Sequence, residues 1–421
     1  MKLRSFGSTI LAVAVTAALA PSAFAQYDYD NGSSDDAAGT GDAAVEAGAA
    51  ISAQSTSSNG ALPTVIVTVE NAQQSRGVFL TPPWLAIHDG SFDTYDGGEP
   101  ASVPLGGVEI EALAEDGNNG PLSETFRSLL PDAPEVTALA GPGGPLAPGD
   151  SASIAFYVDP SLDRYFSYAS MIIPSNDFFI ANGNPRAHLL FNEGGGFVGQ
   201  DFTVGGAASN DAGTEVNDEF ALNVAFLGQA GPNTGESENG VVTTPAPGFA
   251  DPGTLTFPDG VLSHAAFGNT NFGNSAVMNV SFRYVDLNRF QRFDSVLDAG
   301  QEVGATVGSN ATGEGILRSF SDRSLQVQIA TDGLSGRIQM AHLHLGAAGS
   351  NGPVIANLGD LILSGGRRVF GRIDESVLTD AFDGDYEDFL RTLAAGNVYI
   401  NIHTEAYPAG EIRGQVSLRE R

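Results

Sequence analysis

The chain has 421 residues, a formal net charge of −31 and no cysteine. This length is enough for two or three domains with large cores, and the absence of cysteine excludes disulfide bonds as a source of stability. The negative charge disfavours nucleic acid and anionic membranes as partners, because the long-range field of the protein repels both. Salt screens the self-repulsion of so acidic a chain, so we expect a marine or halophilic source.

Residues 1–25 have the pattern of a secretory signal peptide. Lys2 and Arg4 form the basic start, residues 8–20 are mostly apolar, and the sequence AFA before Gln26 is a typical cleavage site. The apolar stretch is too short for a bilayer span, and no later stretch reaches about 18 apolar residues. We therefore expect a Sec-exported protein, secreted or periplasmic/extracellular, without an integral membrane segment.

Residues 26–61 are rich in Gly, Ala, Ser and Asp and contain few aromatic residues. They offer too little apolar surface to offset the entropy lost on ordering. The composition predicts a flexible, disordered acidic linker. A calcium repeat is the alternative interpretation of its aspartates, but no repeat spacing supports it.

Residues 62–287 alternate repeatedly between apolar and polar positions. Val65, Val67 and Val69 share one face of an expected strand, and residues 276–287 alternate again. A short helix is expected near residues 122–130. Many short strands separated by Gly/Pro-rich turns predict an all-β fold.

Two acidic motifs stand out within this region. The sequence SMIIPSNDFFIANG (170–183) carries Asp177, and NDAGTEVNDEF (210–220) carries Asp211 and Glu215 around an Ala-Gly-Thr turn. Three carboxylates on loops at the end of a β-structure are suitable ligands for Ca²⁺, which prefers oxygen and negative charge. The alternative is a set of solvated acidic loops in a very acidic protein.

These two motifs resemble the signatures of the spondin N-terminal domain, and the resemblance extends over roughly residues 60–285. It implies a C2-like β-sandwich with Ca²⁺ held by Asp177, Asp211 and Glu215. Animal members have Trp where this chain has Phe178, and Asp where it has Glu215. They also use cysteines, so the cysteine-free chain fits a bacterial member.

Three later blocks resemble, in order, the diagnostic blocks of the CHRD domain, named after chordin. They read RFDSVLDAGQEV, AHLHLGAAGSNGPVIANL and NVYINIHTEAYPAGEIRGQVSL. The resemblance implies an immunoglobulin-like or barrel-like β-domain over residues 288–421. One departure is Gly304-Ala305 after QEV, where the family usually has Pro. We expect the chain to divide near residues 286–292 into two parts that fold independently.

Three histidines are the residues of this second part that most clearly suggest a binding site. His342 and His344 are two residues apart on an expected strand, so both side chains leave the same face. His403 lies on the polar face of another expected strand. If the strands are neighbours, the three rings could bind Zn²⁺ or Cu²⁺, with Glu411 as the carboxylate that orients one ring. The alternative is a structural cluster held by hydrogen bonds.

The function predicted from these features is that of an exported, calcium-binding adhesion or interaction protein of the cell envelope or extracellular matrix. We expect it to be non-catalytic, because no nucleophile elbow is visible and the glycine-rich sequence at residues 193–199 lacks the Lys-Ser/Thr of a phosphate loop. The expected partner is an extracellular protein or glycan. One alternative is a Cu/Zn-dependent enzyme or metal-binding protein centred on the histidines, and another is a passive structural surface component.

Overall fold

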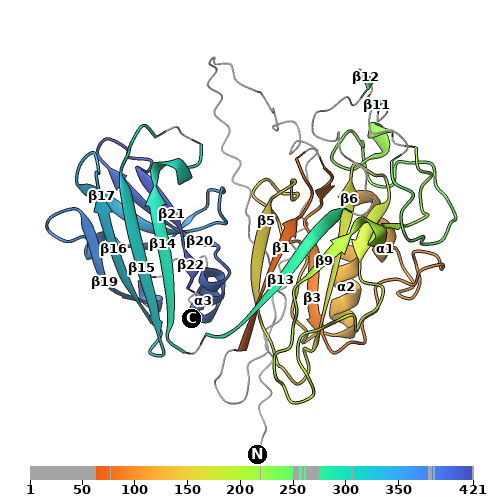
Figure 1. The fold of residues 1–421 in the computed structure, drawn as a ribbon, viewed down its shortest axis with the longest axis horizontal. Coiled ribbons are helices and arrows are strands. Elements are labelled where there is room, and N and C mark those ends of the chain that lie inside the picture. The colour runs from red at the N-terminus through yellow and green to blue at the C-terminus, as the bar shows by residue number, and fades with distance from the viewer. Residues whose placement is uncertain are drawn as a thin grey trace, which may run out of the picture.

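The computed structural model describes residues 63–75, 77–218, 220–249, 256–257, 260–261, 275–287, 289–304, 307–377, 382 and 385–419. The expected signal peptide and acidic linker lie outside these residues. Three short α-helices accompany many strands in the described part, which confirms the predicted all-β class (Figure 1). None of these helices is long and apolar enough to span a membrane.

Two sheets pack face to face in the first half of the chain. One has the strand order β5 (Ser151–Tyr157), β1 (Pro63–Asn71), β13 (Ala276–Asp286), β9 (Phe202–Gly205). The other has the order β10 (Asn210–Asp211), β7 (Phe178–Ala181), β6 (Tyr165–Ile173), β3 (Trp84–His88), β4 (Glu135–Val136), with β2 (Phe79–Leu80) and β8 (His188–Leu189) also paired to β6. Val65, Val67 and Val69 of β1 join one buried cluster with Leu85, Ile87 and Phe166 of the second sheet. The predicted alternation therefore supplies the core of a sandwich.

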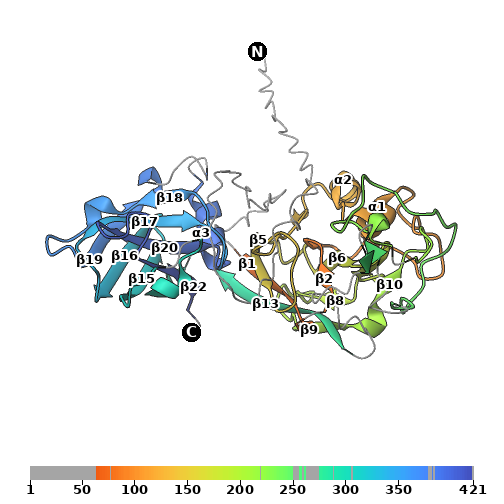
Figure 2. The same ribbon diagram turned by 90° about the horizontal axis from the view of Figure 1, so that it is seen from above.

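Two helices, α1 (Glu109–Asp116) and α2 (Gly120–Leu129), cover the outer face of the second sheet (Figure 2). Helix α2 confirms the helix predicted near residues 122–130, and its Phe126 is fully buried. Trp84 packs edge-on against Phe126 and donates its indole N–H to Glu135 Oε2 at 2.7 Å. The single Trp is thus a core anchor. Because both faces of this sheet are covered, almost every residue of β6 is buried.

The second half of the chain forms one antiparallel sheet. Its order is β18 (Val354–Asn357), β17 (Ile338–Leu345), β20 (Val398–Thr404), β21 (Ile412–Gln415), β14 (Gln291–Asp298), β15 (Thr312–Phe320), β16 (Ser324–Asp332), β19 (Arg368–Asp374), with β22 (Ser417–Leu418) also paired to β14. Leu317, Val327, Leu343 and Ile400 come from different parts of this sheet and share one core. The sheet therefore curls around its apolar face, and α3 (Tyr386–Ala394) contributes Phe389 to the same core.

The remaining elements are short and lie mostly in loops. They are the strand pair β11 (Thr256–Phe257) and β12 (Gly260–Val261), and the 3₁₀ helices Gly206–Ala208, Ala221–Asn223, Ala299–Gln301, Gly359–Leu361 and Glu375–Val377.

Helix α3 also packs against the outer face of β5 from the first half of the chain. Tyr157 is 1% exposed and donates its hydroxyl proton to the Glu387 carbonyl at 2.7 Å. The Arg391 guanidinium lies 4.5 Å from the centre of the Tyr157 ring, where cation–π attraction adds to the packing. Nearby, the Asn397 amide donates to the Ser153 carbonyl at 2.8 Å. Buried contacts therefore join the two halves across the expected boundary.

Because of this contact, fragments 62–287 and 289–421 should each melt at a lower temperature than the full chain. Within the full chain, Tyr157→Ala should cost about 3 kcal/mol of unfolding free energy, because it opens a cavity beneath α3. Tyr157→Phe removes only the hydrogen bond and should cost about 1 kcal/mol. Calorimetry of both fragments and both variants checks this. Fragments as stable as the full chain would show that the contact contributes nothing.

Candidate metal centres

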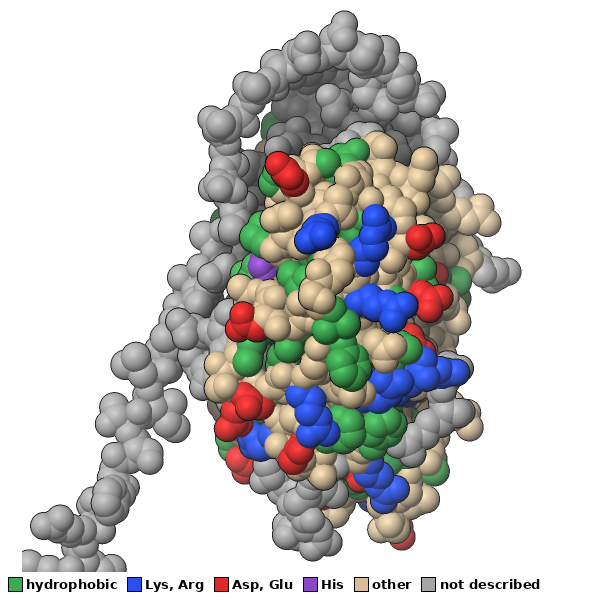
Figure 3. Space-filling view, turned by 90° about the vertical axis from the view of Figure 1, so that its left-hand side faces the viewer, with side chains coloured by type: hydrophobic (Ala, Val, Ile, Leu, Met, Phe, Trp, Pro, Cys, Tyr) green, Lys and Arg blue, Asp and Glu red, His purple; other side chains and the backbone are tan. Residues whose placement is uncertain are grey.

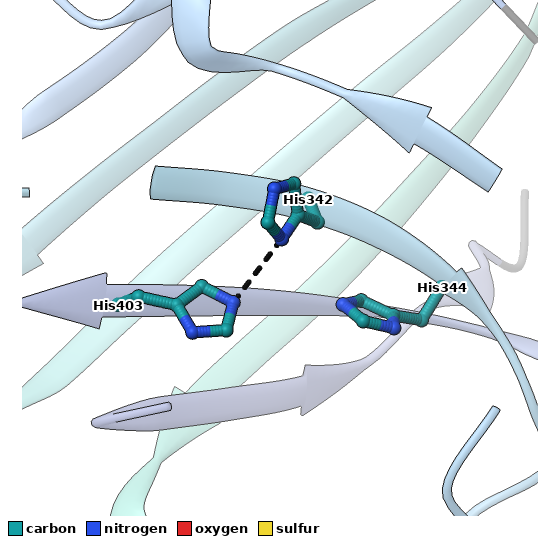
Figure 4. A group of neighbouring side chains, drawn as sticks. All are labelled: His342, His344 and His403. Carbon is teal, nitrogen blue, oxygen red and sulfur yellow. Dashed lines mark hydrogen bonds between the residues drawn. The ribbon is translucent and has the colours of Figure 1, made fainter. Parts of the chain in front are cut away.

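The histidine pair of β17 projects from one face of the sheet. Leu343 between them is fully buried on the opposite face. Strand β20 runs antiparallel to β17, with His403 opposite Met340, one position along the same face from His342. The pairing therefore brings His342, His344 and His403 together, and Figure 4 shows the three rings pointing toward one another.

The three imidazoles can each present one nitrogen to a shared point. These nitrogens all lie within 4.8 Å of one another, and no other group of metal-binding side chains in the described residues meets that condition. Nδ1 of His342 lies 3.2 Å from Nε2 of His403. The ring centroids of His342 and His344 are 5.6 Å apart. At this spacing, one metal ion could bind a nitrogen from each ring and replace the contact between His342 and His403.

Backbone carbonyls fix the orientation of two of these rings. Nδ1 of His344 lies 3.0 Å from the Gly352 carbonyl oxygen, and Nδ1 of His403 lies 2.9 Å from that of Pro408. Since a carbonyl only accepts, each Nδ1 carries the proton and each Nε2 keeps a lone pair. The lone pair of His403 Nε2 accepts a hydrogen bond from Nδ1 of His342. Nε2 of His344 is buried and has no hydrogen-bond partner among the described residues. A metal ion at the shared point would satisfy that nitrogen, so the residues fit Zn²⁺ or Cu²⁺.

His344, Tyr399 and Arg413 stack in that order, and this stack also fixes the His344 ring. This ring lies against Tyr399 with centroids 4.8 Å apart and planes 10° from parallel. The Arg413 guanidinium lies 3.5 Å from the centre of the Tyr399 ring and donates to the Ser350 carbonyl at 2.6 Å. Neither Tyr399 nor Arg413 was predicted from the sequence to support the cluster. Their strand positions, which place both side chains on the same polar face as His403, could have indicated it.

The surroundings keep all three histidines neutral at pH 7. Burial, followed by repulsion from His403 and His344, lowers the pKa of His342 to about 4. Burial also lowers the pKa of His344 and of His403. Neutral imidazole is the form that binds metal, so protonation competes with a metal ion only in acidic solution.

The expectation that Glu411 orients a histidine is wrong. Its Oε1 accepts hydrogen bonds from the Ser309 hydroxyl and from the Ser335 amide and hydroxyl, each at 2.8 Å, and its Oε2 accepts from Thr404 at 2.6 Å. Burial alone would raise the pKa of Glu411, but these hydrogen bonds outweigh burial and hold it below 4.5. Glu411 instead ties two loops to the sheet, and the Pro408 carbonyl takes its expected place.

Strand pairing also joins the two acidic motifs. Strands β7 and β10 pair with Asp211 opposite Phe178, which places Asp177 beside the second motif. Asp177 is fully buried, and its Oδ2 accepts from the backbone N–H groups of Thr214 at 3.1 Å and Glu215 at 3.2 Å. Its Oδ1 is buried without a hydrogen-bond partner. An unpaired buried carboxylate oxygen is costly unless a proton or a cation satisfies it.

The carboxylates of this acidic cluster repel one another. Burial raises the pKa of Asp177 above 3.8, and the charges of Asp211 and Glu215 raise it further. Glu215 is 1% exposed, and burial raises its pKa as well. The cluster offers oxygen ligands and negative charge, which suit Ca²⁺.

Glu115 is a fourth carboxylate near this cluster, and it was not predicted from the sequence. It comes from the end of α1, is 2% exposed, and its Oε2 has no hydrogen-bond partner. Burial raises its pKa to about 8, and the charge of Glu215 contributes to that rise. The available signal was its place directly after the apolar residues Leu113 and Ala114, in a segment where no helix was predicted.

The position of Glu411 leads to a test of its structural role. Glu411→Ala should lower the unfolding free energy by about 3 kcal/mol, because buried hydroxyls and an amide lose their acceptor. Glu411→Gln keeps one acceptor oxygen and should cost less. Since folding lowers the pKa of this carboxyl, its contribution is complete at neutral pH and is lost as the pH falls through the folded-state pKa. Urea denaturation at pH 7 and at about pH 3.5 measures both effects, and an unchanged midpoint for Glu411→Ala would contradict the assignment.

Comparison with known proteins supports the second resemblance found in the sequence. No curated protein and no solved structure matches the chain. Residues 293–416, which include all three histidines, match the CHRD domain family. The curled sheet that carries the histidine cluster is therefore the part of the chain that is similar to CHRD domains, which are domains of extracellular type.

Proposed function

We propose that the chain is an exported, non-catalytic interaction protein whose CHRD domain binds Zn²⁺ or Cu²⁺ through His342, His344 and His403. One observation carries the proposal: the buried Nε2 of His344 has no partner and faces two other neutral imidazoles. The layered support of Tyr399 and the carbonyl contacts hold the rings in place before any ion arrives, which reduces the ordering cost of binding.

Imidazole ligands favour copper and zinc among the common divalent ions, and copper binds most tightly in that series. Three nitrogens leave at least one coordination position for another ligand. In the proposed function that position receives a donor group from a partner. The second candidate, a Cu/Zn-dependent enzyme, would place a substrate there, and the observation that favours it is that only three protein nitrogens converge among the described residues.

We also propose that the acidic cluster of the spondin-like region binds Ca²⁺ through Asp177, Asp211 and Glu215. The unpaired Oδ1 of Asp177 and the mutual repulsion of the carboxylates support this assignment. An extracellular calcium ion would relieve both and rigidify the end of the sandwich that carries β7 and β10. If the protein needs calcium to bind its partner, its role is adhesion. If it is a passive structural component, it binds no partner.

The histidine site should bind about one Zn²⁺ or Cu²⁺ per chain, with a rise in melting temperature. His344→Ala and His403→Ala should each abolish that rise. Because the pKa of His342 is about 4, binding should persist at about pH 5.5, where ordinary histidines are largely protonated. Isothermal titration and elemental analysis measure the stoichiometry.

His188→Ala is the matched control for the histidine site. This ring stacks on Phe202 at 3.7 Å in the first half of the chain, so its loss should leave metal binding unchanged. If the wild type takes up neither ion, the three histidines are a structural cluster. The two cluster variants would then lose stability equally with and without added metal.

Calcium should stabilise the wild type by roughly 2.7 kcal/mol when present at 100 times its dissociation constant. Asp177→Asn should lose that gain. In chelator at pH 7, however, the same variant should melt at or above the wild-type temperature, because it removes a buried carboxylate whose pKa is raised. By the same linkage, Asp177 should make the calcium-free wild type less stable as the pH rises from about 4 to 7.

Asp89→Asn removes an equal charge from an exposed loop and is the matched control. It should keep the full calcium response in thermal denaturation. An equal calcium shift for the wild type and Asp177→Asn would place the calcium elsewhere.

A further inference from the structure

Basic side chains are concentrated in the CHRD half of this acidic chain. Twelve of the 19 Lys and Arg residues lie in residues 288–421, which leaves that half with a formal net charge of −5. Figure 3 views the molecule from the side where β16 and β19 lie in Figure 1. It shows Lys and Arg side chains gathered there, with hydrophobic side chains between them.

Strand register aligns several of these arginines in one row. Arg292 of β14 is opposite Arg318 of β15, and Gln326 of β16 lies between Arg318 and Arg372 of β19. At least one neighbour of each along its strand is buried in the core, so these side chains point away from it. Arg368 lies four residues before Arg372 and therefore shares its face. We call Arg292, Arg318, Arg368 and Arg372 the arginine face.

Aromatic surface lies among these guanidinium groups. Phe370, between Arg368 and Arg372 on the same face, is 49% exposed. The Arg372 guanidinium lies 4.2 Å from the centre of the Phe320 ring. Half-exposed aromatic rings flanked by arginine and glutamine side chains present apolar and hydrogen-bonding surface together.

Within the described residues, ion pairs involve two of the four guanidinium groups of the arginine face, and one of these, Arg292, pairs with Asp294 at 2.7 Å. Among the described residues, Arg318 and Arg368 form no ion pair. Arg372 pairs with Asp322 at 3.2 Å, but both side chains are at least half exposed, so the pair is worth little. An anionic ligand could therefore displace these contacts and bind the planar guanidinium groups bidentately.

The dimensions of the arginine face suit a polymer. Three strand spacings separate β14 from β19, about 14 Å, and four residues of β19 span about 13 Å. One small anion cannot reach all four arginines. Glu314 and Asp374 also lie on this face, so a densely charged nucleic acid would meet repulsion, and the negative charge of the whole half disfavours it further. A polyanion whose charges are separated by neutral groups fits better.

We propose that the arginine face binds an acidic polysaccharide. Its carboxylate or sulfate groups pair with Arg318, Arg368 and Arg372, and a sugar ring packs on Phe370. This site is separate from both proposed metal centres and does not depend on them. It gives the domain an anionic glycan as its ligand.

The test measures binding of the full chain to alginate, a polyuronate, at about 0.15 M salt. Affinity should fall as salt rises, because ion pairs are screened and counterions are released. Arg368→Gln/Arg372→Gln should raise the dissociation constant about tenfold or more, since two charge-assisted contacts are lost. Phe370→Ser should also weaken binding. Arg164→Gln/Arg186→Gln removes the same charge from the first half of the chain and should change the constant by less than about twofold.

Neutral dextran and single-stranded DNA complete the comparison. The proposal is overturned if alginate binds no better than dextran, or if both double variants weaken binding equally. Tighter binding of the DNA would identify a nucleic-acid surface instead. Self-association that Arg368→Gln/Arg372→Gln disperses, without alginate binding, would show that the face receives a second copy of the chain.

Discussion

The antiparallel pairing of β17 with β20 is the constraint on which the histidine cluster depends. Side chains alternate across a sheet, so this register sends Leu343 and Ile400 into the core and the three imidazoles to the opposite face. A slip of one residue would bury polar rings and expose the apolar side chains. The same apolar burial that stabilises this sheet therefore determines where the three imidazoles lie.

Period-two patterns made much of this arrangement predictable. Alternation in the sequence was enough to place His342 and His344 on one face, and the family blocks indicated a nearby strand for His403. The behaviour of Glu411 was not predictable, because its partners Ser309 and Ser335 come from loops far away in sequence. A flexible carboxylate binds whichever donors the tertiary structure supplies, and no local pattern specifies them.

For the acidic cluster, too, local motifs were predictable from the sequence, but contacts between distant segments were not. Short motifs identified Asp177, Asp211 and Glu215, and strand pairing brings the two motifs side by side. Glu115 belongs to a helix almost one hundred residues from Glu215, so its approach depends on how α1 packs against the sandwich. Sequence patterns locate residues on elements, whereas packing decides which elements meet.

The carbonyl contacts of His344 and His403 also bear on how this domain can diverge. Gly352 and Pro408 orient the rings through backbone oxygen atoms, not through side chains. Many substitutions in these two loops therefore preserve the ring tautomers, provided that the local backbone path is kept. Related domains could vary the loop surface around the cluster, and with it their choice of partner, while inheriting the same imidazole chemistry.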